Sequence, residues 1–216
     1  MDMTKPIAAL FDFDGVVMDT ETQYTIFWEK IGATYFPEIE NFGIIIKGQT
    51  LVQIYDKYFK DKESVKEEVS KALVDFEKNM TYNFIPGAVE FIRQIRAQGI
   101  RTAIVTSSNR AKMANVYVAH PNLDQLVDRI LLAEDFTRSK PFPDCYLQAA
   151  AALDTVPENC IVFEDSFHGL QSGNSAGMKV VGLSTTNPAS AIADKCHKVI
   201  SDFTTFTYDD MIAVLG

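Results

Sequence analysis

Two aspartates separated by a single residue, Asp12 and Asp14, end an apolar run near the N-terminus. Side chains alternate along a β-strand, so both carboxylates point the same way if a strand beginning near Ile7 continues through them. Two carboxylates at such a short distance repel each other, and this repulsion raises the pKa of one of them. One can then stay ionised as a nucleophile or metal ligand while the other holds a proton as an acid. Gly15 lets the chain turn sharply after the pair, which is also compatible with a solvated strand end.

The apolar segment Arg101–Val105 is followed by a run of hydroxyl and amide side chains, Thr106, Ser107, Ser108 and Asn109. Hydroxyl groups and free backbone N–H groups ahead of a helix form a binding site for anions. The same residue types are also typical helix N-caps. The run therefore predicts a phosphate site, a helix cap, or both.

Lys140 precedes a proline-rich helix start, where a cation is unfavourable for the helix itself. It suits a phosphate oxygen or the carboxylate of Asp12, with an ordinary exposed lysine as the alternative.

Glu164 and Asp165 follow the apolar run Cys160–Phe163. With Asp12 they would supply the oxygen ligands that Mg²⁺ prefers, whereas the plainer interpretation is a polar strand end.

The elements that must position these residues form an alternating pattern. Short apolar runs, typical of buried strands, occur at Ile7–Phe13, Arg101–Thr106, Arg129–Leu132, Cys160–Phe163, Lys179–Leu183 and Lys198–Ile200. Helical patterns lie between them, among them Pro143–Leu153 and Thr207–Leu215. Strands alternating with helices predict an α/β protein with a mostly parallel sheet. Ligands bind beyond the carboxyl ends of such strands, so we expect the polar groups to converge there.

The segment between the first two strands breaks this pattern, because it shows helical patterns and no convincing strand. Capping boxes at Thr20–Gln23 and Ser64–Glu67 predict two helix starts. A helical insertion after the first strand would lie over the carboxyl edge of the sheet as a lid. We therefore expect a core of residues 1–15 and 84–216 and a helical cap of residues 16–83. The apolar loop at 43–50 would point into the cleft.

Composition restricts the possible partners. The 216 residues include 20 Lys and Arg and 29 Asp and Glu, a net charge of −9. That charge repels phosphate backbones, so we expect no nucleic-acid partner. Three cysteines without a short paired spacing suit a reducing cytosol. The N-terminal apolar run is too short for a signal peptide or a membrane span, so we expect a cytoplasmic protein without a membrane partner.

Taken together, these residues resemble the haloacid dehalogenase (HAD) superfamily, and within it the β-phosphoglucomutase-like group of phosphatases and phosphomutases. The resemblance implies a Rossmann-like parallel sheet core, the HAD fold, with an inserted α-helical cap. The motifs that carry it are Asp12-x-Asp14-Gly15 with Asp19-Thr20, Thr106, Ser139-Lys140-Pro141-x-Pro143-Asp144, and Glu164-Asp165-Ser166-x-x-Gly169.

The resemblance implies Mg²⁺-dependent phosphoryl transfer through an aspartyl-phosphate on Asp12. Asp14 would protonate the leaving oxygen and then activate the acceptor, and its backbone carbonyl would also ligate the metal. Asp165 would bind Mg²⁺ directly, and Glu164 directly or through water. Lys140 would neutralise charge at the phosphoryl group.

The resemblance also implies a phosphate site. Thr106 and the amide of Ser107 would hold the transferring phosphoryl group, next to Gly15. Ser108 and Asn109 would reach a second phosphate that is not transferred.

Residues of the cap distinguish a phosphatase from a mutase. β-Phosphoglucomutases share Trp28 and Gly48 with this chain, but they carry a histidine where this chain has Tyr24, and a phosphate-binding arginine where it has Leu51. Lys47 could replace that arginine as a point charge only. A mutase must hold a bisphosphate, and losing a bidentate clamp weakens that case. We therefore expect hydrolysis of a small phosphorylated metabolite such as a sugar phosphate, with a mutase as the alternative.

Two other classes of function stay open. Signalling receiver domains also place acids, Thr or Ser, and Lys at strand ends and accept phosphate on aspartate. Their short connections leave no room for a helical lid of this length. A binding protein without activity is the other alternative, although paired buried acids are costly without a use. Catalytic release of phosphate would distinguish an enzyme from both.

Overall fold

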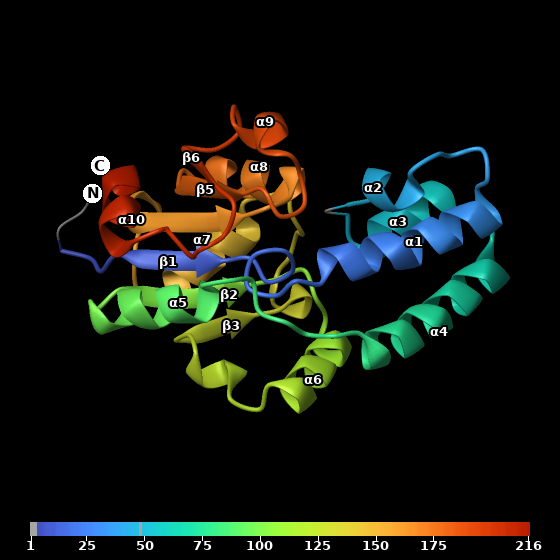
Figure 1. Cartoon of the computed structure of the whole chain (residues 1–216), viewed down its shortest axis with the longest axis horizontal. Coiled ribbons are helices and arrows are strands. Elements are labelled where there is room, and N and C mark those ends of the chain that lie inside the picture. The colour runs from blue at the N-terminus through green and yellow to red at the C-terminus, as the bar shows by residue number, and fades with distance from the viewer. Residues whose placement is uncertain (1–3, 48) are drawn as a thin grey trace.

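The computed structural model describes residues 4–47 and 49–216. Its centre is a six-stranded parallel sheet in the order β3-β2-β1-β4-β5-β6 (Figure 1). Because β1 lies between β2 and β4, the carboxyl ends of these three strands are adjacent. The strands are β1 (Ala8–Phe11), β2 (Arg101–Val105), β3 (Arg129–Leu131), β4 (Cys160–Glu164), β5 (Lys179–Leu183) and β6 (Lys198–Ile200).

Helices cover both faces of this sheet, which confirms the predicted α/β fold class. Alternate side chains of β1 enter two different cores: Ala9 and Phe11 pack with α5, α6 and α10, and Ala8 and Leu10 pack with α7 and α8. The helices of the sheet domain are α5 (Ala88–Ala97), α6 (Arg110–Ala119), α7 (Asp144–Ala152), α8 (Phe167–Ser175), α9 (Ala189–Ile192) and α10 (Tyr208–Leu215). Single 3-10 turns lie at Leu123–Gln125, Ala133–Asp135 and Pro157–Asn159.

The segment between β1 and α5 forms a separate group of helices beyond the carboxyl end of β1 (Figure 1). These are α1 (Glu21–Tyr35), α2 (Phe42–Ile45), α3 (Leu51–Tyr58) and α4 (Glu63–Asn79). They enclose an apolar core of their own, which includes Trp28, Phe36, Phe42, Phe59 and Leu73. The helical insertion agrees with the expected cap, while its exact limits at 16 and 83 stay a prediction.

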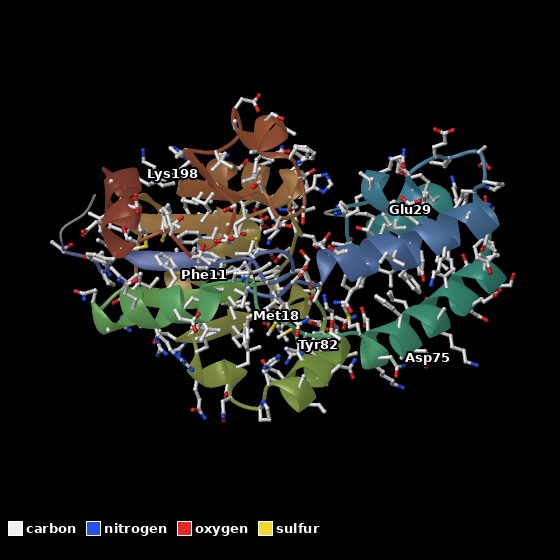
Figure 2. The ribbon with its side chains drawn as sticks, in the orientation of Figure 1. Phe11, Met18, Glu29, Asp75, Tyr82 and Lys198 are labelled. Carbon is white, nitrogen blue, oxygen red and sulfur yellow. The ribbon has the colours of Figure 1, made fainter. Side chains whose placement is uncertain are left out.

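Two connecting segments join the insertion to the sheet domain and run beside each other. The Asp19 amide donates to the Asn83 carbonyl at 2.8 Å, and the Ile85 amide donates to the Val17 carbonyl at 2.9 Å. Met18, labelled at this junction in Figure 2, is fully buried in the core of the sheet domain. Packing therefore anchors the first connection firmly to the sheet domain.

Both predicted capping boxes are wrong. Thr20 precedes α1, but its hydroxyl donates to a carboxylate in the site instead of capping the helix. The Gln23 side chain binds the backbone of Thr81 instead, donating to its carbonyl and accepting from its amide, both at 2.9 Å. Ser64 lies inside α4, because that helix begins at Glu63. In both cases a cap pattern was outweighed by contacts from distant segments or by an earlier helix start.

None of the helices in the described part of the chain is both long and apolar enough to cross a membrane.

Candidate active site

The carboxylate of Asp12 lies just beyond β1, which ends at Phe11 and not at Phe13 as predicted. The Asp12 amide still donates to the Phe163 carbonyl on β4 at 3.0 Å, which holds Asp12 beside the end of that strand. Carboxylate oxygens of Asp12, Glu164 and Asp165 lie within 4.8 Å of one another, and all three residues are buried. The fold therefore brings together three acids that are far apart in sequence.

Lys140 joins this cluster from the loop before α7. Its Nζ donates to Asp12 Oδ1 at 2.7 Å, to Glu164 Oε1 at 2.6 Å and to the Val105 carbonyl at 3.2 Å. The lysine is 6% exposed. Burial opposes its charge, but the two carboxylates outweigh burial and raise the pKa of Lys140. It is therefore a fixed cation beside Asp12, one of the two partners expected from the sequence.

Glu164 is held by five donors among the described residues, one of them the Ser166 hydroxyl, which donates to Oε2 at 3.2 Å. Oε1 accepts from Lys140 and, at 2.9 Å, from the Tyr146 hydroxyl. Oε2 accepts from the amides of Asp165 at 3.0 Å and Ser166 at 3.2 Å. Gly169 makes this arrangement possible, because a Cβ there would lie 1.8 Å from Glu164 Cδ. The start of α8 thus leaves room for the carboxylate.

The acid cluster carries an excess of negative charge, because one ammonium faces three carboxylates. Burial, opposed by Lys140 and reinforced by Glu164, raises the pKa of Asp12 to about 7. Burial and Glu164 also raise the pKa of Asp165. A divalent cation would remove this repulsion, and the available donors are all carboxylate oxygens. The donor set therefore fits Mg²⁺.

Asp14 lies beyond the end of β1 at Phe11 and lines the same pocket as Asp12, but its carboxylate has hydrogen-bond donors of its own. Its carboxylate accepts from the Thr20 hydroxyl, from Ser108 Oγ at 2.8 Å and from Lys112 Nζ at 2.6 Å. Burial alone would raise the pKa of Asp14, but the Lys112 ammonium and these hydrogen bonds outweigh burial and lower it. The two aspartates thus lie in opposite electrostatic environments.

The loop after β2 serves partly as a helix cap. The Asn109 side chain accepts from the Lys112 amide at 2.9 Å, which caps α6. Thr106 Oγ1 accepts from the Ser108 amide at 3.0 Å. Ser107, Ser108 and Asn109 also line the pocket above Asp12. The helix-cap interpretation of the run is confirmed, whereas the phosphate site stays a prediction for residues that face a cavity.

Gly15 is the turn after the aspartate pair, with φ +79°. A Cβ there would lie 2.1 Å from Asp165 Oδ2, so glycine allows the close approach of the turn to the acid cluster. The Thr185 hydroxyl donates to the Gly15 carbonyl at 2.6 Å, and the Thr186 hydroxyl donates to Asp165. The loop after β5 therefore holds the turn and the acid cluster through these two threonine hydroxyls. The sequence analysis did not predict this contribution.

The pocket lies between the sheet domain and the insertion. Asp12, Lys140 and Asp165 share it, so the predicted residues do not fall on different sides of the molecule. Trp28 lines it but is only 6% exposed and packs edge-on against Phe27. Gly48 lies outside the described residues. The insertion contributes Glu21, Tyr24, Thr25, Trp28, Gly43, Ile46, Lys47, Gln49, Thr50, Leu51, Ile54, Leu73 and Glu77.

Sequence reasoning missed three charged residues of this pocket. Lys112 is 5% exposed and binds Asp14. Glu21, at the start of α1, has a pKa raised to about 7 by burial and by Asp14. Glu77 accepts from the Tyr24 hydroxyl at 2.9 Å. A cation in the first turn of α6, where the helix dipole disfavours it, was the signal that could have drawn attention to Lys112.

Sequence comparison identifies a protein family and individual relatives that are similar to this chain. The family model described as haloacid dehalogenase-like hydrolase matches residues 9–183. A phosphorylated carbohydrates phosphatase of Thermotoga maritima is 27% identical over 80% of this chain and 82% of its own length. A β-phosphoglucomutase of Bacillus subtilis is 28% identical over 91% of each chain.

Solved structures agree on the fold. The crystal structure of a β-phosphoglucomutase from Clostridium difficile superposes with a TM-score of 0.79 at 24% identity, over 97% of both chains. The chain also matches a far longer protein, SUPPRESSOR OF QUENCHING 1 of Arabidopsis thaliana, at 28% identity over 93% of this chain and only 20% of the relative.

Proposed function

The chain belongs to the haloacid dehalogenase-like hydrolase family, in its β-phosphoglucomutase-like group, and from that premise we propose that it is a Mg²⁺-dependent phosphatase of small phosphorylated metabolites, such as sugar phosphates. Phosphoryl transfer of the HAD type is the chemistry of this family. The observation that carries the proposal is the buried cluster of Asp12, Glu164 and Asp165 with Lys140 at its centre.

In this proposal Asp12 is the nucleophile. Its carboxylate oxygen bonds to phosphorus while the bond from phosphorus to the ester oxygen breaks. Asp14, which its lowered pKa leaves ionised in the free protein, takes up a proton from the monoanionic phosphate ester or from solvent and passes it to that departing oxygen, and the alcohol leaves. Asp14 then takes a proton from water, whose oxygen attacks phosphorus and releases inorganic phosphate from Asp12. Lys140, 2.7 Å from Asp12, offsets the charge of an anion attacking an anion.

Mg²⁺ would be held by the Asp12 and Asp165 carboxylates and by the backbone carbonyl of Asp14. The five donors already bound to Glu164 favour a contact through water for that residue. The ion would supply charge neutralisation at the phosphoryl oxygens. Thr106, the Ser107 amide and Lys140 would hold the transferring group, with Gly15 giving it access.

The pocket favours a phosphatase over a mutase. The wall formed by the insertion has Leu51 where β-phosphoglucomutases carry a phosphate-binding arginine, and Lys47 in the same wall could replace that arginine only as a point charge, without its bidentate contact. Of the groups proposed for a second phosphate, the Ser108 hydroxyl already donates to Asp14, whereas Asn109 uses only its side-chain oxygen to cap α6. A monophosphate with an apolar or hydroxylated body fits this wall better than a bisphosphate.

A mutase remains the second candidate, because Trp28 lines the pocket and the chain is 28% identical to a β-phosphoglucomutase. A panel of phosphorylated metabolites, assayed for phosphate release and isomerisation in parallel, tests the choice. We expect phosphate release to dominate, EDTA to stop it and Mg²⁺ to restore it. Conversion of β-glucose 1-phosphate with a bisphosphate primer into glucose 6-phosphate, faster than phosphate release, would contradict the phosphatase proposal.

A further inference from the structure

Lys112 is a buried cation for which α6 itself provides no reason. It lies in the first turn of that helix, next to the N-terminal end, where the helix dipole disfavours positive charge. Only 5% of the residue is exposed, so its ammonium also loses most of its hydration. Its Nζ lies 2.6 Å from Asp14 Oδ1. The ion pair with Asp14 is the interaction that offsets these costs.

The same ammonium contacts the helical insertion. Lys112 Nζ lies 4.5 Å from the ring centroid of Tyr24 on α1, within the range of a cation–π interaction. The Tyr24 hydroxyl in turn donates to Glu77 Oε1 on α4 at 2.9 Å. A continuous set of polar contacts thus runs from Asp14 through Lys112 to two helices of the insertion.

Of the three donors to the Asp14 carboxylate, Lys112 is the charged one. Thr20 and Ser108 donate through neutral hydroxyls. A charge-assisted hydrogen bond is stronger than a neutral one, so Lys112 contributes most to the direction of the carboxylate. Its placement depends on Tyr24, and hence on the insertion lying over the sheet domain.

We propose that Lys112 is a positioning residue for Asp14, which it holds in the geometry for proton transfer by linking that carboxylate to the Tyr24 ring of the insertion. This inference rests on the proposed acid–base role of Asp14. Lys112 acts through Asp14 and does not itself bind the substrate.

The test compares two leaving groups in the variant Lys112→Met, which keeps most of the unbranched side chain and removes its charged amino group. One substrate is p-nitrophenyl phosphate, whose phenolate leaves without needing a proton. The other is the alkyl phosphate hydrolysed fastest in the metabolite panel, whose alkoxide must be protonated. We expect kcat to fall about 10- to 100-fold for the alkyl ester but less than about threefold for p-nitrophenyl phosphate, with KM little changed.

Lys198→Met is the matched control. Lys198 also pairs with an aspartate, Asp210 at 3.0 Å, and lies 5.5 Å from the ring centroid of Phe206. It sits on the sheet domain, away from the insertion (Figure 2). We expect this variant to hydrolyse both substrates like the unmodified protein. An equal loss on both substrates in Lys112→Met would indicate a purely structural role and overturn the inference.

The double variant shows whether Lys112 acts through Asp14. Asp14→Asn alone should show the same preference for the better leaving group, and adding Lys112→Met should then cause no further loss. A rise in KM from Lys112→Met in both backgrounds would mean direct contact with the substrate and overturn the positioning role. If Asp14→Asn does not discriminate between the leaving groups, the acid–base assignment of Asp14 itself fails, together with the inference built on it.

Discussion

At the scale of single residues, two aspartates two positions apart in sequence meet different surroundings. Asp12 shares one lysine with Glu164 beside a third acid, and burial raises its pKa to about 7. Asp14 accepts from three donors, one of them charged, and its pKa is lowered. Paired acids with divided roles were expected from the sequence, but the direction of each shift was not, because it depends on burial at Asp12 and, at Asp14, on Lys112 and the other hydrogen-bond donors.

The raised pKa of Asp12 predicts how stability depends on pH without metal. Between the ordinary value of 3.8 and about 7, the folded state binds more protons than the unfolded state. The free energy of unfolding therefore falls as pH rises through this window. From pH 8 to pH 6 the metal-free protein should gain about 1.4 kcal/mol, or roughly 3–6 °C in melting temperature.

Thermal melts in EDTA and in excess Mg²⁺ measure this effect. Mg²⁺ should raise the melting temperature most at pH 8, where the repulsion is largest, and so reduce the dependence on pH. Asp12→Asn should melt with a weaker dependence on pH in EDTA, which Glu21 and Asp165 do not let vanish because their pKa values are also raised. A metal-free protein that melts at a lower temperature at pH 6 than at pH 8 would contradict the assigned charge balance.

At the scale of helices and strands, the sequence predicted the sheet well because its strands are continuous apolar runs. The carboxyl ends of parallel strands meet at one edge, so Asp12 and Asp165 could be placed together before the structure was known. Caps were harder to predict, because Thr20 and Gln23 form contacts with Asp14 and Thr81 that local patterns do not reveal. Lys112 escaped notice for the same reason, since its partners lie on other elements.

Gly169 ties the start of α8 to the chemistry of the site. A Cβ at this position would lie 1.8 Å from Glu164 Cδ, so Gly169→Ala must displace the carboxylate from Lys140 and Tyr146. We expect a destabilisation of about 1–3 kcal/mol, the usual range for overpacking, and a loss of activity of at least about tenfold.

Urea unfolding and steady-state kinetics check this prediction. Ser175→Ala, an exposed change near the other end of α8, serves as the control and should leave both quantities unchanged. Full activity in Gly169→Ala would show that the position of Glu164 does not matter for catalysis.

At the scale of the whole molecule, the insertion completes the pocket. The sheet domain supplies the acids, Lys140 and the loop after β2, while α1 to α4 supply the opposite wall of the pocket. The identity of that substrate could not be predicted, because it depends on the shape of a wall built from four helices. The net charge of −9 repels an anionic substrate, so the local cations and Mg²⁺ are needed for that substrate to approach.

The most direct test of the account is to identify the residue that carries the phosphoryl group. The protein would be mixed with Mg²⁺ and a ³²P-labelled substrate, quenched in acid within milliseconds, reduced with borohydride and mapped by mass spectrometry. We expect label in the quenched protein and a reduced carboxyl group at Asp12, with neither in Asp12→Asn, which should keep its fold but lose turnover. Label on another residue, or full turnover by Asp12→Asn, would contradict the central claim.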